Sequence, residues 1–129
     1  MLICPNCGEQ LIKTENTFRC VNKHSFDIAS SGYCNLLVGS KAGEFKGDSK
    51  EMVMARRSFL DSGAYEPLRD AVCNTVRNLA PSVVIDAGCG EGYYTRAVAT
   101  VLLDVNNDVI MIGADISKAA TQYASNVTS

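Results

Sequence analysis

The segment from Val83 to Arg96, VVIDAGCGEGYYTR, decides the fold of this chain. A run of β-branched residues ends in the acidic residue Asp86, and a glycine-rich turn then leads into a helical pattern. A short continuous apolar run is typical of a strand buried on both faces of a parallel sheet. Glycines at the carboxyl end of such a strand let the backbone approach a ligand closely. The segment therefore predicts a strand, a ligand-binding turn and a helix.

Strand and helix patterns alternate around this turn. Upstream, helices are predicted from Asp48, which forms a capping box with Glu51, through Gly63, and from Glu66 to Leu79. Downstream, DVIMIGAD reads as a second buried strand and Ser117 as the cap of a last helix. This order predicts the beginning of a doubly wound α/β fold.

The composition of the turn favours S-adenosylmethionine over a dinucleotide. Its pattern, D-x-G-x-G-x-G, is built from Asp86, Gly88, Gly90 and Gly92, whereas a pyrophosphate cradle is usually G-x-G-x-x-G. S-adenosylmethionine carries an ammonium and a sulfonium, which Asp86 and Glu91 are suited to place. Asp115, at the end of the second strand, is suited to accept hydrogen bonds from ribose hydroxyls, but NAD also has such a ribose. Two alternatives stay open: a turn without a ligand, and Asp86 as an acceptor for backbone N–H groups of the turn.

The N-terminal region contains four candidate metal ligands, Cys4, Cys7, Cys20 and His24. They read C-x2-C, a twelve-residue spacer and C-x3-H, and two such pairs can complete a tetrahedron around Zn²⁺. Because protein fills all four positions, we expect a structural zinc. Cys34 is the alternative fourth ligand. Unrelated buried cysteines and a redox C-x-x-C are disfavoured by the four spacings together and by the lack of a strand and helix around the pair.

Composition divides the 129 residues into three parts. We expect a small β-rich zinc-binding module over residues 1–35, a linker or arm over 36–48, and an α/β domain over 49–129. The formal charge of −2 excludes a uniformly basic nucleic-acid binder, so any phosphate contact should come from a local patch, with the first half favoured. Six cysteines without an export signal are typical of metal binding in a reducing cytosol, so a cytoplasmic location is expected. The sequence contains no apolar run of about 18 residues, so it predicts no membrane span.

With both motifs in place, the sequence resembles the zinc-containing 23S rRNA (guanine-N1) methyltransferases of bacteria. The resemblance rests on C-P-x-C…C-x3-H, HSFDIASSGYCNLL, GDSKEMVMARRSFLDSGAYEPLRDAV and VIDAGCGEGYYT, in the family's order and over nearly the whole chain. It implies a class I, Rossmann-like methyltransferase fold and transfer of a methyl group from S-adenosylmethionine to N1 of a guanine in a 23S rRNA hairpin loop. It also implies that the zinc module helps to bind RNA.

Residue roles follow from the motifs and the resemblance together. The resemblance alone implies that Tyr65 lies against the cofactor; an aromatic residue at a helix start that packs on the core is the alternative. The other expected cofactor-binding residues are Asp86, Gly88, Gly90, Glu91, Gly92, Tyr93 and Asp115. The candidates for contact with rRNA phosphates are Arg56, Arg57, Lys41 and Lys46, although a solvated helix face paired with Asp61 or Glu51 explains the two arginines equally well.

The family's chain continues beyond the second strand, through strands that shape the base pocket. We therefore expect the zinc module and half of the cofactor site here, a truncated sheet, and catalytic residues beyond Ser129. Such a chain alone is expected to be inactive and to pair with the missing half or with a second copy as a homodimer. Two alternatives remain. One is a non-catalytic, zinc-bearing RNA-binding fragment with a residual turn; the other is an NAD-dependent enzyme, which the acidic turn disfavours.

Overall fold

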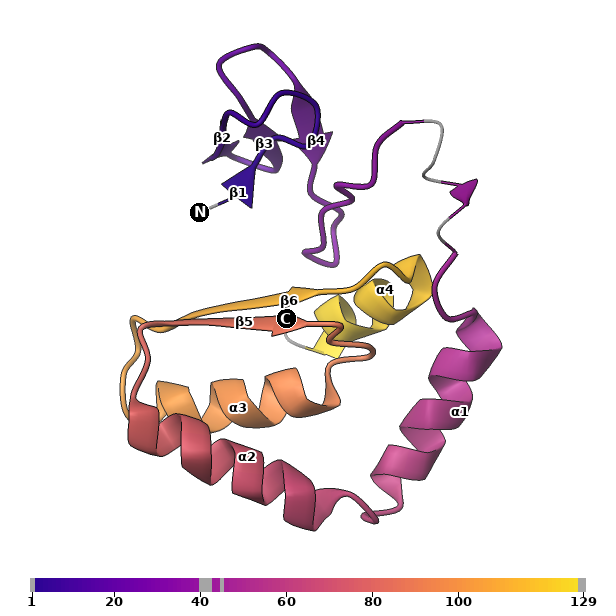
Figure 1. Ribbon diagram of the computed structural model, residues 1–129, viewed down its shortest axis with the longest axis vertical. Coiled ribbons are helices and arrows are strands. Elements are labelled where there is room, and N and C mark those ends of the chain that lie inside the picture. The colour runs from indigo at the N-terminus through magenta and orange to yellow at the C-terminus, as the bar shows by residue number, and fades with distance from the viewer. Residues whose placement is uncertain (1, 40–42, 45, 128–129) are drawn as a thin grey trace. The chain divides into compact units, whose positions relative to one another are not determined.

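The computed structural model describes residues 2–39, 43–44 and 46–127, and these form two compact units that divide between Lys46 and Gly47 (Figure 1). The first unit holds the β-rich N-terminal region, and the second holds the alternating helices and strands. Lys41, a predicted RNA contact, lies outside the described residues. None of the helices in the described part of the chain is long and apolar enough to cross a bilayer.

The first unit is a four-stranded antiparallel sheet whose strands are neighbours in chain order. The strands are β1 (Leu2–Ile3), β2 (Gln10–Thr14), β3 (Thr17–Arg19) and β4 (Ser25–Asp27). The buried core consists of Cys4, Leu11, Cys20 and Phe26, so two of its four members are predicted zinc ligands. Leu36, expected in the linker, packs against this core. The predicted β-rich module is confirmed.

The second unit contains the predicted α/β elements. These are α1 (Lys50–Asp61), α2 (Glu66–Leu79), β5 (Val83–Ala87), α3 (Tyr93–Leu103), β6 (Ile110–Ala114) and α4 (Lys118–Val127). β5 and β6 pair in parallel with Ile85 opposite Ile112, so the β5–α3–β6 segment is a strand–helix–strand unit. The glycine-rich turn and Asp115 both follow the carboxyl ends of these strands, as the sequence predicts.

The N-cap of α1 is Ser49 and not Asp48. The Ser49 side chain accepts a hydrogen bond from the Met52 N–H at 3.3 Å. Asp48 has other partners, because its carboxylate pairs with Arg56 at 3.3 Å and its carbonyl accepts a hydrogen bond from Ser117. The capping-box prediction is therefore wrong by one residue, since tertiary contacts take the side chain that the local pattern assigned to the cap.

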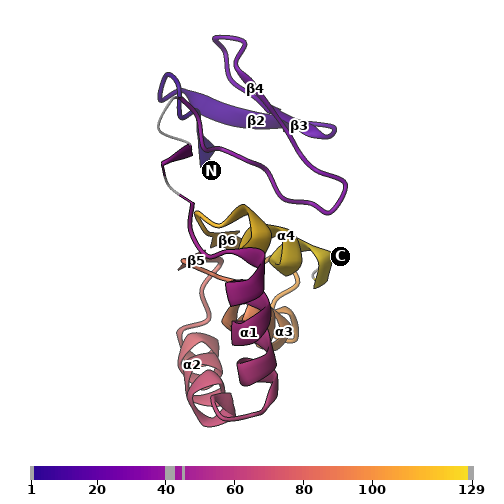
Figure 2. The ribbon, with the colours of Figure 1, turned by 90° about the vertical axis from the view of Figure 1, so that its right-hand side faces the viewer.

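The helices α2 and α3 pack on the same side of the β5–β6 pair (Figures 1 and 2). Val98 and Leu102 of α3 are buried there, and Val84 and Met111 of the two strands pack against them. On the opposite face three strand residues remain exposed, Val83 at 49%, Ile85 at 66% and Ile110 at 53%. The expectation of strands buried on both faces is therefore wrong for the residues described, because their helices cover one face only.

Candidate metal centre and cofactor turn

Two backbone knuckles bring the four predicted metal ligands together. In the first, between β1 and β2, the Cys4 N–H donates to the Glu9 carbonyl at 2.7 Å and the Gly8 N–H donates to the Cys4 carbonyl at 2.8 Å. In the second, between β3 and β4, the Cys20 N–H donates to the His24 carbonyl at 3.1 Å. Each knuckle thus curls back on its first cysteine and directs a pair of ligands to one point.

The ligand atoms lie at the separations that a tetrahedral zinc site requires. All four are within 4.8 Å of one another. The His24 Nδ1 is 3.6 Å from Cys4 Sγ and 3.4 Å from Cys20 Sγ, and the Cys7 and Cys20 sulfurs are 3.7 Å apart. Zn–S bonds of about 2.3 Å and Zn–N bonds of about 2.0 Å at tetrahedral angles give about 3.8 Å between sulfurs and about 3.5 Å from sulfur to nitrogen. These side chains fit Zn²⁺.

Thiol ionisation fits the same role. Hydrogen bonds from the Asn22 side chain and the Glu9 backbone lower the pKa of the Cys7 thiol to about 6, so Cys7 is a thiolate at neutral pH. Burial raises the pKa of Cys4, which must lose its proton when metal binds. Cys34, the alternative ligand, lies outside the cluster, and its Sγ is 3.8 Å from the Phe26 carbonyl. Among the described residues the fourth ligand position therefore belongs to His24.

The glycine-rich turn after β5 is held by backbone bonds to the end of β6. The Gly88 and Cys89 N–H groups donate to the Ala114 carbonyl at 2.7 and 3.0 Å. The Gly90 N–H donates to Asp115 Oδ2 at 2.9 Å. Because these bonds satisfy the Gly88, Cys89 and Gly90 N–H groups, they hold this part of the turn against the end of β6.

The three glycines of the turn have different structural roles. All have positive φ, 81° at Gly88, 56° at Gly90 and 88° at Gly92. A Cβ at Gly88 or Gly90 would meet nothing within 4 Å, whereas a Cβ at Gly92 would lie 3.2 Å from the Ala124 side chain. Gly92 thus lets α3 approach α4. Gly88 and Gly90 leave open backbone of the kind that a close-lying ligand needs.

Two polar atoms beside the turn are buried without a partner among the described residues. They are Oε1 of Glu91, a residue only 3% exposed, and the hydroxyl of Tyr93, 9% exposed. The other Glu91 oxygen pairs with Arg96 at 3.2 Å. A buried polar atom without a hydrogen bond is costly, so these two groups suit a polar ligand in the turn. Together with the open glycines they fit S-adenosylmethionine, whose ammonium would match the Glu91 carboxylate.

Asp86 and Asp115 are held by protein groups. Asp86 Oδ2 accepts the Thr95 hydroxyl at 2.5 Å, while the turn N–H groups bond elsewhere, so its alternative role as their acceptor is wrong. Asp115 accepts the Gly90 N–H through Oδ2 and the Ser117 N–H through Oδ1 at 2.7 Å. Each carboxylate oxygen has a second lone pair, so a ribose contact at Asp115 stays a prediction.

Cys89 is a buried cysteine that lies outside the zinc cluster. Its side chain lies against Gly113 of β6, where an added Cβ would come within 3.1 Å of the sulfur. Burial first, and then the Asp86 and Asp115 charges, raise the pKa of the Cys89 thiol to about 11. The thiol is therefore protonated and packs as a small apolar group.

Tyr65, expected beside the cofactor, is the N-cap residue of α2 and is 42% exposed. Its ring meets the Phe59 ring edge to face, with the centroids 5.6 Å apart. At the start of α3, the Tyr93 ring lies 5.7 Å from the Arg69 guanidinium, a contact that joins α2 to the turn. The role of Tyr65 toward a ligand stays a prediction.

The predicted RNA-contacting arginines are ion-paired. Arg56 pairs with Asp48 at 3.3 Å and Arg57 with Asp61 at 3.7 Å. In the first unit Lys46 is exposed, and no ion pair within the described part of the chain involves it. The same is true of three further exposed cations of that unit, Lys13, Arg19 and Lys23. Exposed cations without an ion pair among the described residues therefore lie on both units: these four on the zinc unit, three of them at positions that the sequence did not single out, and Lys50, Arg77 and Lys118 on the second unit.

Sequence reasoning also missed partners that shape the turn. Thr95 holds Asp86, and Arg96 holds Glu91 through both its carboxylate and its carbonyl. A helical register that places Thr95 and Arg96 in the first turn of α3 was the available signal, because side chains there lie beside the preceding turn. The Ser117 hydroxyl was predicted as a cap, which its 3.1 Å bond from the Ala120 N–H confirms.

Comparison with known proteins gives a consistent result. Residues 2–42 match the family model of the zinc ribbon described as RlmA, N-terminal. The chain is 36% identical over 127 residues to the 23S rRNA (guanine(748)-N(1))-methyltransferase of Streptomyces fradiae, over 95% of the chain and 43% of that protein. It is 34% identical over 143 residues to a candidate 23S rRNA (guanine-N1)-methyltransferase of Micromonospora griseorubida, over 95% of the chain and 46% of that protein.

The chain spans less than half the length of these two relatives. The zinc-ribbon match covers the unit that carries the Cys4, Cys7, Cys20 and His24 cluster, and the relatives' similarity extends through the glycine-rich turn. The resemblance is therefore confirmed: residues 2–42 match the family model of the RlmA N-terminal zinc ribbon, and the chain is similar over nearly its whole length to two proteins named as 23S rRNA (guanine-N1)-methyltransferases.

Proposed function

We propose that this chain supplies the zinc ribbon and half of the cofactor site of an S-adenosylmethionine-dependent methyltransferase that acts on N1 of a guanine in a 23S rRNA hairpin loop. The glycine-rich turn carries the proposal, because Gly88 and Gly90 leave open backbone next to the unpartnered Glu91 and Tyr93 polar atoms. The two relatives support the reaction and the RNA class. A Rossmann-like sheet, a homodimer and a cytoplasmic location remain predictions.

The residues of the second unit would bind and orient the cofactor. Gly88 and Gly90 would let it approach the backbone, Glu91 would meet its ammonium, and Asp115 would accept its ribose hydroxyls. When bound, S-adenosylmethionine supplies a methyl group that its sulfonium has already activated. The protein's task is then mainly to hold the guanine N1 in line with that methyl group and to accept the N1 proton.

The first unit would hold a structural zinc and contact RNA. Cys4, Cys7, Cys20 and His24 fill the four positions of a tetrahedral metal, so no position stays open for chemistry. Arg19 and Lys23 are exposed and unpaired among the described residues, so they can meet phosphates at little desolvation cost. The guanine itself must be unstacked or lie in a loop to be reached.

The cofactor proposal is tested by calorimetric titration of the purified protein with S-adenosylmethionine. We expect micromolar binding, and we expect Gly88→Ala to weaken it at least tenfold because a methyl group would occupy the open backbone. Gly32→Ala is the matched control, because Gly32 also has positive φ, 97°, and nothing within 4 Å of its Cβ position. Binding of NAD in place of S-adenosylmethionine would overturn the proposal in favour of a dinucleotide enzyme.

The reaction is tested with 23S rRNA transcripts and methyl-labelled S-adenosylmethionine, followed by nucleoside analysis. The expected product is N1-methylguanosine from a single loop position, formed by the complete enzyme and not by this chain alone. An RNA-binding protein that neither binds S-adenosylmethionine nor transfers its methyl group would instead be a non-catalytic zinc-bearing RNA-binding module.

A further inference from the structure

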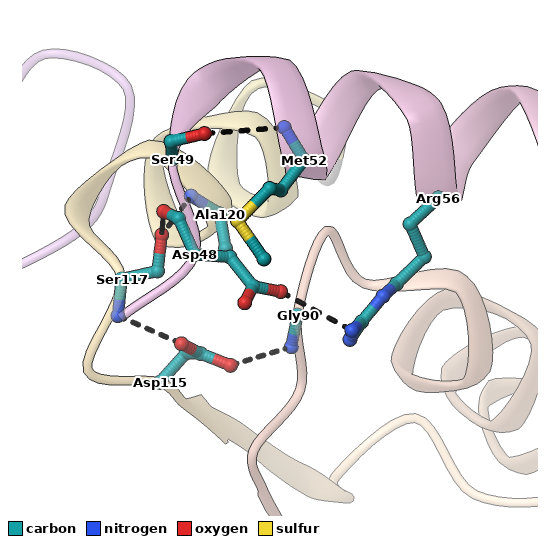
Figure 3. Close-up of polar contacts among 8 residues, drawn as sticks. All are labelled: Asp48, Ser49, Met52, Arg56, Gly90, Asp115, Ser117 and Ala120. Carbon is teal, nitrogen blue, oxygen red and sulfur yellow. Dashed lines mark hydrogen bonds and ion pairs between the residues drawn. The ribbon is translucent and has the colours of Figure 1, made fainter. Parts of the chain in front are cut away.

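Ser117 is completely buried, and its contacts join two helix starts to the cofactor turn (Figure 3). Its hydroxyl donates to the Asp48 carbonyl at 2.6 Å, which lies 69 residues earlier, just before α1. The same oxygen accepts the Ala120 N–H at 3.1 Å and so caps α4. Its own N–H donates to Asp115 Oδ1 at 2.7 Å. The hydroxyl and the backbone N–H of this one residue thus connect the starts of α1 and α4 to Asp115.

The segment before α1 is fitted closely to Ser117. Gly47 has φ of 55°, and a Cβ there would lie 2.8 Å from both the Cα and the backbone nitrogen of Ser117. Backbone atoms cannot give way as a flexible side-chain tip does. Gly47 and Asp48, expected to be linker, are therefore built into the second unit at this contact.

Asp115 connects Ser117 to the glycine-rich turn. Its two carboxylate oxygens accept N–H groups from opposite sides, Ser117 at 2.7 Å and Gly90 at 2.9 Å (Figure 3). Hydrogen bonds to a carboxylate are among the stronger ones and fix the plane of the group. The position of Gly90 is therefore set through Asp115 by how Ser117 is anchored.

We propose that Ser117 is a positioning residue for the cofactor site: by holding the backbone of Asp48 it fixes Asp115, and through Asp115 it fixes the open backbone at Gly90. The inference rests on the proposed cofactor function and adds to it a residue that touches no cofactor atom. Without the hydroxyl, the Asp48 carbonyl loses its donor and the Asp115–Ser117 segment loses its attachment to α1. The affinity for the cofactor is then lower, because binding must restore an orientation that the ligand-free protein no longer holds.

The test compares Ser117→Ala with Ser49→Ala. Both variants remove the serine that caps a helix, since Ser49 caps α1 through the Met52 N–H, but Ser49 has no contact with Asp115 among the described residues. We expect both to melt at a lower temperature than the wild type. Measured by calorimetry well below either melting temperature, the dissociation constant for S-adenosylmethionine should rise about tenfold in Ser117→Ala and stay within twofold in Ser49→Ala. In turnover assays of the complete enzyme carrying the same substitution, the KM for S-adenosylmethionine should rise while the KM for RNA stays unchanged.

Equal cofactor affinity in Ser117→Ala and the wild type would overturn the inference, as would an equal loss in both serine variants. Should Ser117→Ala fail to fold, Gly47→Ala tests the same contact, with Gly32→Ala as the control that shares positive φ but meets no atom. A wild-type protein that binds no S-adenosylmethionine would overturn the proposed function itself, and this inference with it. If the wild type binds S-adenosylmethionine and only Ser117→Ala or Gly47→Ala loses affinity, the loss comes from faulty positioning of the cofactor site.

Discussion

The two units of this chain are stabilised in different ways. The zinc unit buries four residues, two of them cysteines of the metal cluster, and none of the ion pairs within the described residues lies in it. The α/β unit packs α2 and α3 against its strands and, among its described residues, adds five ion pairs and the Ser117 contacts. A core as small as the first one does not offset the entropy of ordering its loops without a further constraint. The comparison indicates that metal organises one unit and packing organises the other.

Removal of zinc should produce the largest difference in stability between the two units. A chelator strong enough to strip the metal is expected to unfold the first unit completely, because metal binding there is part of the folding free energy. The second unit should keep its helices. Circular dichroism would show the retained helix signal, and limited proteolysis would show cleavage confined to residues 2–46.

Cysteine variants test which thiols bind the zinc of the first unit. Cys20→Ser should abolish stoichiometric zinc in metal analysis, whereas Cys34→Ser should retain it, because Cys34 lies outside the ligand cluster. Equal protease resistance with and without metal would contradict the assignment of zinc as the organiser of the first unit.

RNA binding should divide between the units by charge, with an intermediate effect. Arg19→Ala combined with Lys23→Ala removes two unpaired cations of the zinc unit, and Arg56→Ala combined with Arg57→Ala removes two cations that are paired with Asp48 and Asp61. The first pair should lower the slope of log affinity against log salt by about 1.4 for a single-stranded loop, because each phosphate that is no longer neutralised accounts for about 0.7. The second pair should change it less.

Fluorescence anisotropy with an rRNA hairpin at several salt concentrations measures both slopes. A larger effect from the Arg56 and Arg57 pair would reverse the comparison and restore α1 as the principal RNA contact.

The smallest expected effect is the pH dependence that Cys89 gives to the α/β unit. The folded thiol has a pKa of about 11, above its ordinary value of 9.0, so the folded state holds this proton more tightly than the unfolded state does. The stabilisation is complete below pH 9 and is lost as pH rises through 11. Denaturant unfolding at about pH 8 and about pH 10 should show a smaller difference between wild type and Cys89→Ala at the higher pH. A constant difference would mean that the thiol is not desolvated.

Several features were predictable because they depend on residues close in sequence. The cysteine and histidine spacing identified all four members of the metal cluster, since each knuckle is closed by its own backbone bonds. The bounds of α2 agree with the prediction because Pro67 and Pro81 limit the helix locally. The turn after β5 and the Ser117 cap followed from equally short patterns.

The misses arise where distant segments compete for the same group. Asp48 fits a capping box, but Arg56 and Ser117 take its side chain and its carbonyl, and Ser49 becomes the cap. Asp86 fits a turn acceptor, but the Thr95 hydroxyl reaches it, while the Ala114 carbonyl and the Asp115 carboxylate take turn N–H groups. No local pattern reports which of two acceptors a folded chain will bring within reach.

The ligands of the metal cluster, the order of strands and helices, and the glycines of the turn can all be read from local patterns, because spacing and backbone preference act within a few residues. The folded structure was needed to show which face of the β5–β6 pair is covered, which cations are paired, and how Ser117 connects Asp48 to Asp115 and Gly90. The physical reason is distance along the chain. Ser117 and Asp48 are 69 positions apart in the sequence, and Asp115 and Gly90 are 25 apart. Such contacts exist only once packing has brought the segments together.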